Sequence, residues 1–389
     1  MRSRQSWILC DTSRDAYTPE LRLTANDLAG LAPGCSVVKR TLHGGLRDGV
    51  DVVEIDNGAF RCTVLPTRGM GLWRAALGDL ELGWHAPAPG PVNPRNVNLW
   101  EPSGLGWLRG FDELLCRCGL ESNGGPVFDE QGRLLYPLHG RIANTPAWKL
   151  ELAIDDGEIS LTGVVDEACL YHSKLRLTST IRTRAGETGL RIEDTVTNLS
   201  AEPGQMELLY HTNFGQPLLE PGAEIVAPAK TVVPWTARAA DGVDHWNIYG
   251  PEEPGFTEQV YFLDLAAGAT DETEVLLRGA RAERGVSLHF SKREFPYFTL
   301  WKSTQAAADG YVTGLEPGVN LPNERPFEEA QKRVVELAGG ESRTLHLRLE
   351  AHGTSASVAT AAKRIAELAK GAAPHVLPRP QLPWAPIAS

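Results

Sequence analysis

Hydrophobic and polar residues alternate over many short segments of this chain. Residues 174–183 (KLRLTSTIRT) place leucine, serine and isoleucine on one face, and residues 189–198 (GLRIEDTVTN) show the same alternation. A period of two is typical of a strand that buries one of its faces. The intervening AGETG (185–189) is a turn signal, so the two segments are predicted to form an antiparallel hairpin.

Comparable segments continue from DVVEID, which begins at residue 51, to TLHLRLEAHG, which ends at residue 353, and give more than ten strand candidates. The chain's 39 glycines and 27 prolines separate them, and strands do not alternate with helices. This pattern predicts an all-β fold of antiparallel strands, either a large sandwich or a barrel-like pair of sheets.

One helix is predicted near the C-terminus. Residues 354–371 (TSASVATAAKRIAELAKG) begin with threonine and serine, have an alanine-rich interior and end at glycine. Hydrophobic side chains from Val358 to Leu368 form one stripe, which should dock on the sandwich. We therefore expect three parts: an N-terminal segment packed on the sandwich (1–45), the β-sandwich itself (46–352), and the C-terminal helix with an irregular, proline-rich tail (353–389).

Composition and charge exclude several function classes. Hydrophobic residues make up 42% of the 389 residues, which is enough for a real core. The net charge of -11 argues against sequence-independent binding to nucleic acid and against docking on an anionic membrane. No stretch of the sequence reaches the roughly 20 apolar residues of a membrane span. We therefore expect a small-molecule ligand, and a homodimer is possible.

The cysteines and the N-terminus indicate the compartment. A charge at Asp11 interrupts the N-terminal residues before they could form the apolar core of a signal peptide. Cys116 and Cys118 form a CxC pair, without a second pair at zinc-finger spacing. We expect six reduced thiols in a cytoplasmic protein and no metal site.

Four segments carry side chains that chemistry could use. In VLPTRGMGL (64–72), Arg68 lies on a turn, where it is either a solvated charge or a rigid donor for ligand oxygens. In YPLHGRIANTPAW (136–148), His139 is followed by two further polar candidates, Arg141 and Asn144. A lone histidine is more often a hydrogen-bonded structural residue than a catalyst.

The other two segments end strands. In ELLYHTNFGQPLL (207–219), His211 and Asn213 share one strand face just before a bend. In DGYVTGLEPGVNLP (309–322), Glu316 precedes Pro317 at the rim of a strand, which suits acid–base work, although a lone glutamate there is usually a surface residue.

Tryptophans are numerous and could stack on sugar rings, although tryptophan is also a common core residue. Those on predicted loops and strand ends are Trp84, Trp100, Trp107, Trp148, Trp246 and Trp301.

Together these segments resemble the DUF4432 family of the galactose mutarotase-like superfamily, which is related to aldose 1-epimerases. The matching stretches are LPTRGMGL, FDELLCRCGLESNGGP (111–126), LHGRIANTPAW, LLYHTNFGQPLL and YVTGLEPGVNLP, in the expected order along most of the chain. The resemblance implies a β-supersandwich with a carbohydrate cleft across one sheet.

The resemblance also implies roles for individual residues. His139 matches a histidine that lines the cleft, His211 matches the general acid, and Glu316 matches the general base. Arg68 corresponds to the arginine that grips sugar hydroxyls. Asn213, Asn144, Arg141 and Arg117 are further substrate-binding candidates, and the arginines leave room for an anionic group on the sugar.

Two departures from the family pattern put the substrate in doubt. Asp112, Glu113 and Arg117 introduce charge into a segment that is usually neutral in this subgroup. The acidic sugar-binding residue of true mutarotases has no clear match, and Asp244 and Asp264 are only candidates.

The expected function is that of an aldose 1-epimerase, which interconverts sugar anomers by Glu/His acid–base catalysis without a cofactor. Two alternatives stay open. The same pair could abstract a C–H proton in a keto-sugar isomerase, epimerase or lyase, or the chain could bind carbohydrate without catalysis.

Overall fold

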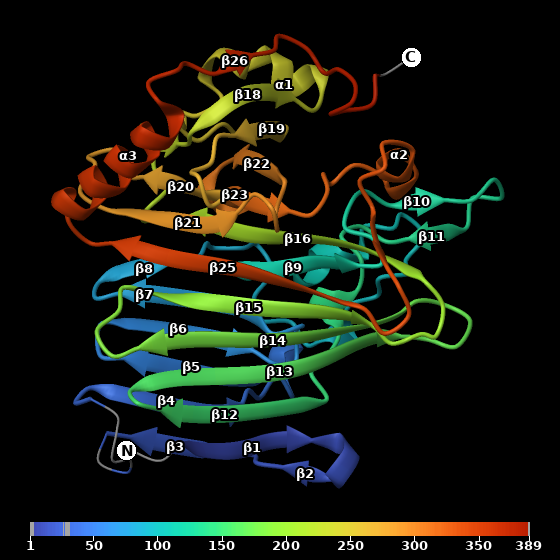
Figure 1. Ribbon diagram of the computed structural model, residues 1–389, viewed down its shortest axis with the longest axis vertical. Coiled ribbons are helices and arrows are strands. Elements are labelled where there is room, and N and C mark those ends of the chain that lie inside the picture. Colours follow the sequence, from blue (N-terminus) through green and yellow to red (C-terminus); the bar gives the residue numbers. More distant parts are fainter. Residues whose placement is uncertain (1–3, 26, 28–31, 388–389) are drawn as a thin grey trace.

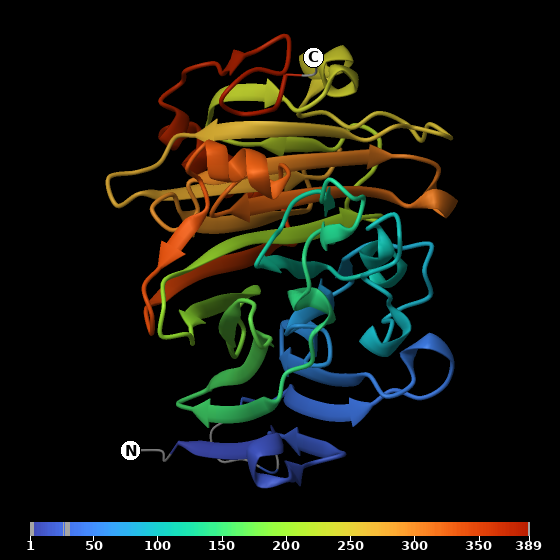
Figure 2. The ribbon, with the colours of Figure 1, turned by 90° about the vertical axis from the view of Figure 1, so that its right-hand side faces the viewer.

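Two large β-sheets face each other in the computed structural model, which describes residues 4–25, 27 and 32–387 (Figures 1 and 2). The first is a ten-stranded sheet. Its order is β17 (Glu224–Val226), β20 (Glu272–Arg278), β21 (Gly285–Ser291), β25 (Ser342–His352), β15 (Gly189–Asn198), β14 (Lys174–Arg184), β13 (Glu158–Ala168), β12 (Lys149–Asp155), β1 (Gln5–Asp11) and β2 (Ala16–Tyr17). The all-β prediction is therefore confirmed.

The second is a fourteen-stranded sheet. Its order is β26 (His375–Val376), β18 (Ala229–Pro234), β19 (Gln259–Leu265), β22 (Tyr297–Thr304), β23 (Tyr311–Gly318), β16 (Gly204–Gly215), β9 (Leu115–Leu120), β7 (Gly71–Leu77), β6 (Phe60–Leu65), β5 (Asp51–Asn57), β4 (Cys35–Thr41) and β3 (Leu21–Thr24), with β24 (Val335–Leu337) beside β16 and β8 (Leu80–Leu82) beside β7. Strand β26 joins β18 in parallel, whereas the other described pairs of these sheets are antiparallel.

Smaller elements connect the strands. A two-stranded sheet consists of β10 (Val127–Phe128) and β11 (Leu134–Tyr136). The α-helices are α1 (Ala237–Asp241), α2 (Arg325–Ala330) and α3 (Ser355–Ala369), and the 3-10 turns are η1 (Thr12–Arg14), η2 (Gly45–Arg47), η3 (Pro94–Asn96), η4 (Gly106–Gly110), η5 (Ile142–Asn144), η6 (Val243–His245) and η7 (Ala307–Asp309). None of the helices in the described part of the chain combines the length and hydrophobicity that crossing a bilayer requires.

The hairpin and the helix predicted from the sequence are both present. Strands β14 and β15 pair in antiparallel register, with Leu177 opposite Val196. Helix α3 starts at the predicted cap, where the Thr354 side chain accepts a hydrogen bond from the Ser357 amide. Val358 and Ile365 of its hydrophobic stripe pack on Leu276 of β20.

The segment 1–45 contributes edge strands to both sheets: β1 and β2 to one, β3 and β4 to the other. Residues 1–3, 26 and 28–31 of that segment lie outside the described residues. In Figure 1, β1–β3 lie at one end of the long axis, and β26 and α1 lie at the other.

Strand β16 shows how alternate side chains point either into the hydrophobic core or to the outer face of the fourteen-stranded sheet. Tyr210 and Phe214 belong to the main core, which contains hydrophobic residues of both large sheets. His211 and Asn213 alternate with them, so their side chains lie on the opposite face of the fourteen-stranded sheet. Loop residues including Trp84, Trp107 and Phe111 pack on this outer face.

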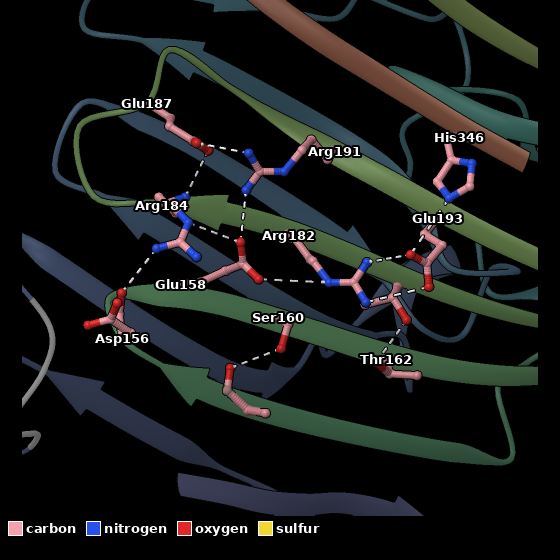
Figure 3. Close-up of polar contacts among 12 residues, drawn as sticks. Asp156, Glu158, Ser160, Thr162, Arg182, Arg184, Glu187, Arg191, Glu193 and His346 are labelled. Carbon is pink, nitrogen blue, oxygen red and sulfur yellow. Dashed lines mark hydrogen bonds and ion pairs between the residues drawn. The ribbon is translucent and has the colours of Figure 1, made fainter. Parts of the chain in front are cut away.

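The outer face of the ten-stranded sheet carries a charge lattice, shown in Figure 3, of Arg182, Arg184, Arg191, Glu158, Glu187 and Glu193. Glu158 lies 3.2 Å from Nε of Arg184 and 3.0 Å from Nη2 of Arg191. A groove of about 520 Å³ runs over part of this face, and within its lining Arg182 pairs with Glu193 and His346 pairs with Glu294.

Candidate active site

The centre of the site is a histidine held by an asparagine on the same strand. Nδ1 of His211 lies 2.6 Å from Oδ1 of Asn213. The Asn213 amide nitrogen donates to the carbonyls of Glu113 and His211, at 3.0 and 3.1 Å. Oδ1 must therefore accept, so Nδ1 of His211 carries the hydrogen and Nε2 of the neutral ring has a free lone pair.

Nε2 of His211 faces a buried carboxylate. Glu316 lies on β23, and its Oε1 is 3.2 Å from Nε2, although Oε1 makes no hydrogen bond within the described structure. Burial raises the pKa of Glu316 well above its usual value, and Cys118 and Glu258 add to that rise against the opposing effect of His139. Burial and the charge of His139 lower the pKa of His211 to about 3. Both shifts favour a neutral pair, with a carboxylic acid beside an unprotonated Nε2.

His139 approaches the pair from a loop. Its backbone adopts a φ of 57°, and its amide donates to the Gly124 carbonyl over 2.9 Å. Nδ1 donates to the Asn123 carbonyl over 2.8 Å. The ring centre lies 5.4 Å from that of His211 and 4.6 Å from that of Trp107. With this backbone conformation, the ring of His139 lies beside the pair of His211 and Glu316.

The thiol of Cys118 on β9 interacts with His139. Burial opposes charge on both groups, but the Cys118 thiol, the Asn123 carbonyl and Glu316 raise the pKa of His139 to about 9. Hydrogen bonds with Cys116 and His139 and the charge of His139 lower the pKa of Cys118 to about 6. From the sequence, Cys116 and Cys118 were expected only to be reduced thiols.

These side chains open on a cavity of about 330 Å³, a volume in the range of small-molecule sites. Its lining consists of Leu105, Trp107, Leu108, Phe111, Gly125, Leu138, His139, His211, Trp235, Glu258, Val260, Thr299, Trp301, Glu316 and Pro322. Phe111 and Trp301 lie 5.0 and 5.3 Å from the His211 ring centre. The cavity therefore surrounds a few polar groups with aromatic and aliphatic walls.

Three of the lining residues hold buried polar atoms that lack a hydrogen-bond partner in the described structure. They are Nε1 of Trp107, Oγ1 of Thr299 and Oε1 of Glu316. Buried polar groups are nearly always paired in folded proteins, and exceptions often mark functional sites. Their gathering around one cavity indicates a place for a polar ligand.

Comparison with known proteins places the chain in a family. The sequence model of the domain of unknown function DUF4432 matches residues 47–351. The chain belongs to the DUF4432 family. No curated protein matches its sequence.

Solved structures agree with this assignment to the DUF4432 family. A crystal structure from Klebsiella pneumoniae, of a protein provisionally described as an aldose 1-epimerase, is 31% identical, with 96% of this chain and 98% of that chain covered and a TM-score of 0.92. A galactose mutarotase-like protein from Clostridium acetobutylicum is 14% identical, with 78% and 95% covered and a TM-score of 0.54. The galactose mutarotase-like fold is therefore confirmed.

The arginine expected to grip sugar is turned away from the cavity in this DUF4432 chain. Arg68 is 1% exposed and forms an ion pair with Glu113. It also donates to the carbonyls of Val92 and Gly110 and to Oδ1 of Asn144, each over 2.9 Å. Arg68 and Asn144 thus tie the loops around the site together, and neither lines the cavity within the described residues.

The other two arginines also have protein partners. Arg117 points between the sheets, where it pairs with Asp194 of β15 and donates to Ser179 over 2.9 Å. Arg141 contacts two carboxylates, Glu121 at 2.5 Å and Glu167 at 3.4 Å. The structure therefore brings His139, His211, Asn213 and Glu316 together, but not the three arginines.

Two polar lining residues were missed from the sequence. Thr299 lies opposite Glu316 in the register of β22 and β23. Glu258 accepts a hydrogen bond from Nε1 of Trp301 over 2.6 Å and lies between His211 and Glu316 in the sequence. Asp264, a candidate for an acidic sugar ligand, instead pairs with two lysines away from the cavity. No turn or spacing signal marks Glu258 or Thr299, because cross-strand register places Thr299 and the indole of Trp301 holds Glu258, which directly precedes β19.

One group in the described residues has the types and spacing to hold a metal ion: Glu274, Glu350 and His352, on β20 and β25. Arg364 donates to both oxygens of Glu274 over 2.8 Å and lies 3.3 Å from Glu350. The guanidinium of Arg364 offsets the charge of the carboxylates and would repel a metal cation. The group therefore fits a role in attaching α3 to the sheet.

Proposed function

We propose that this DUF4432 protein is an aldose 1-epimerase in which Glu316 and His211 act as one acid–base pair. The observation that carries the proposal is the 3.2 Å approach of Glu316 Oε1 to His211 Nε2 at the bottom of a small-molecule cavity. Mutarotation needs one group that takes a proton and one that gives a proton, both close to the anomeric carbon. A carboxylic acid beside an unprotonated imidazole nitrogen meets that need.

Ring opening moves two protons in opposite directions. In the resting site, the directions of the pKa shifts leave the proton on Glu316 and the lone pair on His211. Nε2 of His211 then takes the proton from O1, Glu316 gives its proton to the ring oxygen O5, and the C1–O5 bond breaks. The products are an open-chain aldehyde, a carboxylate and an imidazolium.

Ring closure restores the pair. After rotation about C1–C2, the carboxylate of Glu316 takes the O5 proton, O5 attacks C1, and the imidazolium of His211 protonates O1. The roles expected from the family resemblance, glutamate as base and histidine as acid, thus belong to the closing half of the cycle. His139, with its raised pKa, is placed to stabilise negative charge that develops on an oxygen.

The test is the Glu316→Gln substitution. The amide keeps the size of the side chain but cannot exchange a proton, so we expect kcat to fall about 100- to 10,000-fold. The rate is measured by exchange NMR between anomers over a panel of aldoses, after subtraction of the spontaneous rate. Glu367→Gln, on an exposed position of α3, is the matched control. Full wild-type rates in a folded Glu316→Gln protein would show that the assignment is wrong.

The raised pKa of His139 also favours a second candidate reaction. An imidazolium beside a carbonyl oxygen would stabilise an enediolate, which is the intermediate of a keto-sugar isomerase or epimerase. That chemistry exchanges a C–H proton with solvent, whereas mutarotation does not. Deuterium incorporation at carbon during turnover in heavy water would identify it, and sugar binding without any turnover would leave only a binding role.

A further inference from the structure

The charges around the cavity do not suit an anionic ligand. Among the described residues, neither lysine nor arginine lines it. The carboxylate of Glu258 lies in the wall instead, and it is exposed on the surface. The positive charge of His139 already interacts with Cys118. A phosphate or carboxylate on the ligand would therefore lose its hydration without gaining a free cation.

Hydrogen-bonding groups in the wall are also few. The indole nitrogens of Trp235 and Trp301 already donate to Asn323 and Glu258, over 3.0 and 2.6 Å. Once the acid–base pair serves O1 and O5, four side chains are left for every other hydroxyl: the indole nitrogen of Trp107, Thr299, Glu258 and the ring of His139. Burying a hydroxyl without a hydrogen-bond partner is unfavourable, so each surplus hydroxyl would weaken binding.

Leucines form the complementary part of the wall. Leu105 and Leu108 come from the turn η4 and its preceding residue and remain 43% and 49% exposed. Leu138, which directly precedes His139, lines the same cavity. These side chains offer apolar surface to a ligand at the place where polar partners are missing, and covering them would remove that surface from water.

Building on the proposed function, we infer that the preferred substrate is an uncharged deoxy sugar, whose methyl or methylene group lies against the wall of Leu105, Leu108 and Leu138. The methyl group gains contact with the leucines, and the corresponding hydroxyl of the parent sugar would be buried there unpaired. Preference for the deoxy sugar is therefore a property of the wall, separate from the acid–base pair.

Binding tests the inference independently of catalysis. Tryptophan fluorescence, to which Trp107 and Trp301 contribute in the cavity, is titrated with D-fucose against D-galactose and with L-rhamnose against L-mannose. We expect the deoxy sugar of at least one pair to bind about tenfold more tightly than its parent, and D-galacturonate to bind more weakly than D-galactose. Equal or tighter binding of both parents, tighter binding of the uronate, or no binding of either deoxy sugar would overturn the inference.

Turnover in the same samples tests the proposed function separately. A deoxy preference in binding without anomer exchange would reject the epimerase and keep the inference. Anomer exchange without a deoxy preference in binding would keep the epimerase and reject the inference.

A wall variant assigns the preference to the leucines. Leu108→Gln adds hydrogen-bonding groups at a half-exposed position, so we expect the ratio of the two affinities to fall toward one. Leu170→Gln is the matched control and should leave the ratio unchanged. Leu170 is 70% exposed and lies on a turn between β13 and β14. An unchanged ratio in Leu108→Gln would overturn the assignment to this wall.

Discussion

Gly314 shows how one residue without a side chain permits the central contact of the site. It lies two residues before Glu316 on β23, and a Cβ at this position would lie 2.3 Å from Oε1 of Glu316 and 3.1 Å from Cε1 of His211. The approach of the carboxylate to the imidazole therefore depends on empty space beside the strand. The backbone at Gly314 does not have a positive φ, so the requirement is for space and not for conformation.

We predict that Gly314→Ala displaces the Glu316 carboxylate and lowers kcat about 100-fold, because a shift of about 1 Å in a reacting group has effects of that size. Anomer-exchange NMR measures the loss. Gly250→Ala is the matched control, since a Cβ there meets no atom within 4 Å. Equal rates in the two variants would contradict the prediction.

The pH dependence belongs to the same pair. The pKa of His211 is lowered to about 3, so Nε2 should gain its second proton only as the pH falls through that value. The pKa of Glu316 is raised by burial, so the pair should keep its one proton to a higher pH than an ordinary glutamate does. We expect kcat/KM to stay level from neutral pH down to about pH 4, whereas an ordinary histidine would titrate near pH 6.5. The pKa of Cys118 is lowered to about 6, so the profile is repeated in Cys118→Ser, and an acid limb near pH 6.5 in that variant would show that Nε2 is not shielded.

Residue types and strand alternation were enough to predict part of the site. His211 and Asn213 lie two residues apart on one strand, so their common face follows from the period of the strand. The partners of Arg68 could not be found in this way, because Glu113 is 45 residues away and meets it only after folding. The same holds for Thr299, which reaches the cavity through the pairing of β22 with β23, and for Glu258, which meets Trp301 only after folding.

At the scale of elements, the short turn η4 carries much of the cavity wall. It presents Trp107 and Leu108, and Phe111 follows directly. Arg68 holds the end of this turn through the Gly110 carbonyl and holds the neighbouring loop through Val92. The arginine that the family resemblance assigned to the sugar therefore contacts the elements that surround the cavity.

We predict that Arg68→Lys lowers the free energy of unfolding by about 2–4 kcal/mol, because an ammonium group cannot replace a fork that serves four buried acceptors. It should also weaken sugar binding through the loosened turn. Urea unfolding and fluorescence titration measure the two effects. Arg40→Lys, whose pair with Glu54 is nearly half exposed, should change stability by less than about 1 kcal/mol.

At the scale of the whole molecule, an ion pair links the two sheets through their core. Arg117 of β9 meets Asp194 of β15, and Asp194 also accepts from the Tyr210 hydroxyl over 2.6 Å. Arg117 and Asp194 both have side chains with 0% exposure. Strand alternation in β9 puts Arg117 on one face and Cys116 and Cys118 on the other. The sequence alone could not show which of these faces belongs to the core.

We predict that Arg117→Met destabilises the fold by about 3–5 kcal/mol, because it leaves the buried carboxylate of Asp194 without its cation. The double variant Arg117→Met/Asp194→Leu should recover part of that loss, since neither charge then remains. Chemical denaturation of the two variants measures the difference. A double variant less stable than the single one would indicate that Asp194 stabilises the fold mainly through Tyr210 and not through Arg117.

The charge lattice on the outer face of the ten-stranded sheet has a consequence for self-association (Figure 3). A broad, regular sheet face is a surface on which another sheet could stack. Here Glu158 of β13, Arg182 and Arg184 of β14, Arg191 and Glu193 of β15, and Glu187 of the turn between β14 and β15 form ion pairs with one another. Any layer that covered this face would have to strip water from six charges at once, and the cost of that dehydration opposes stacking there.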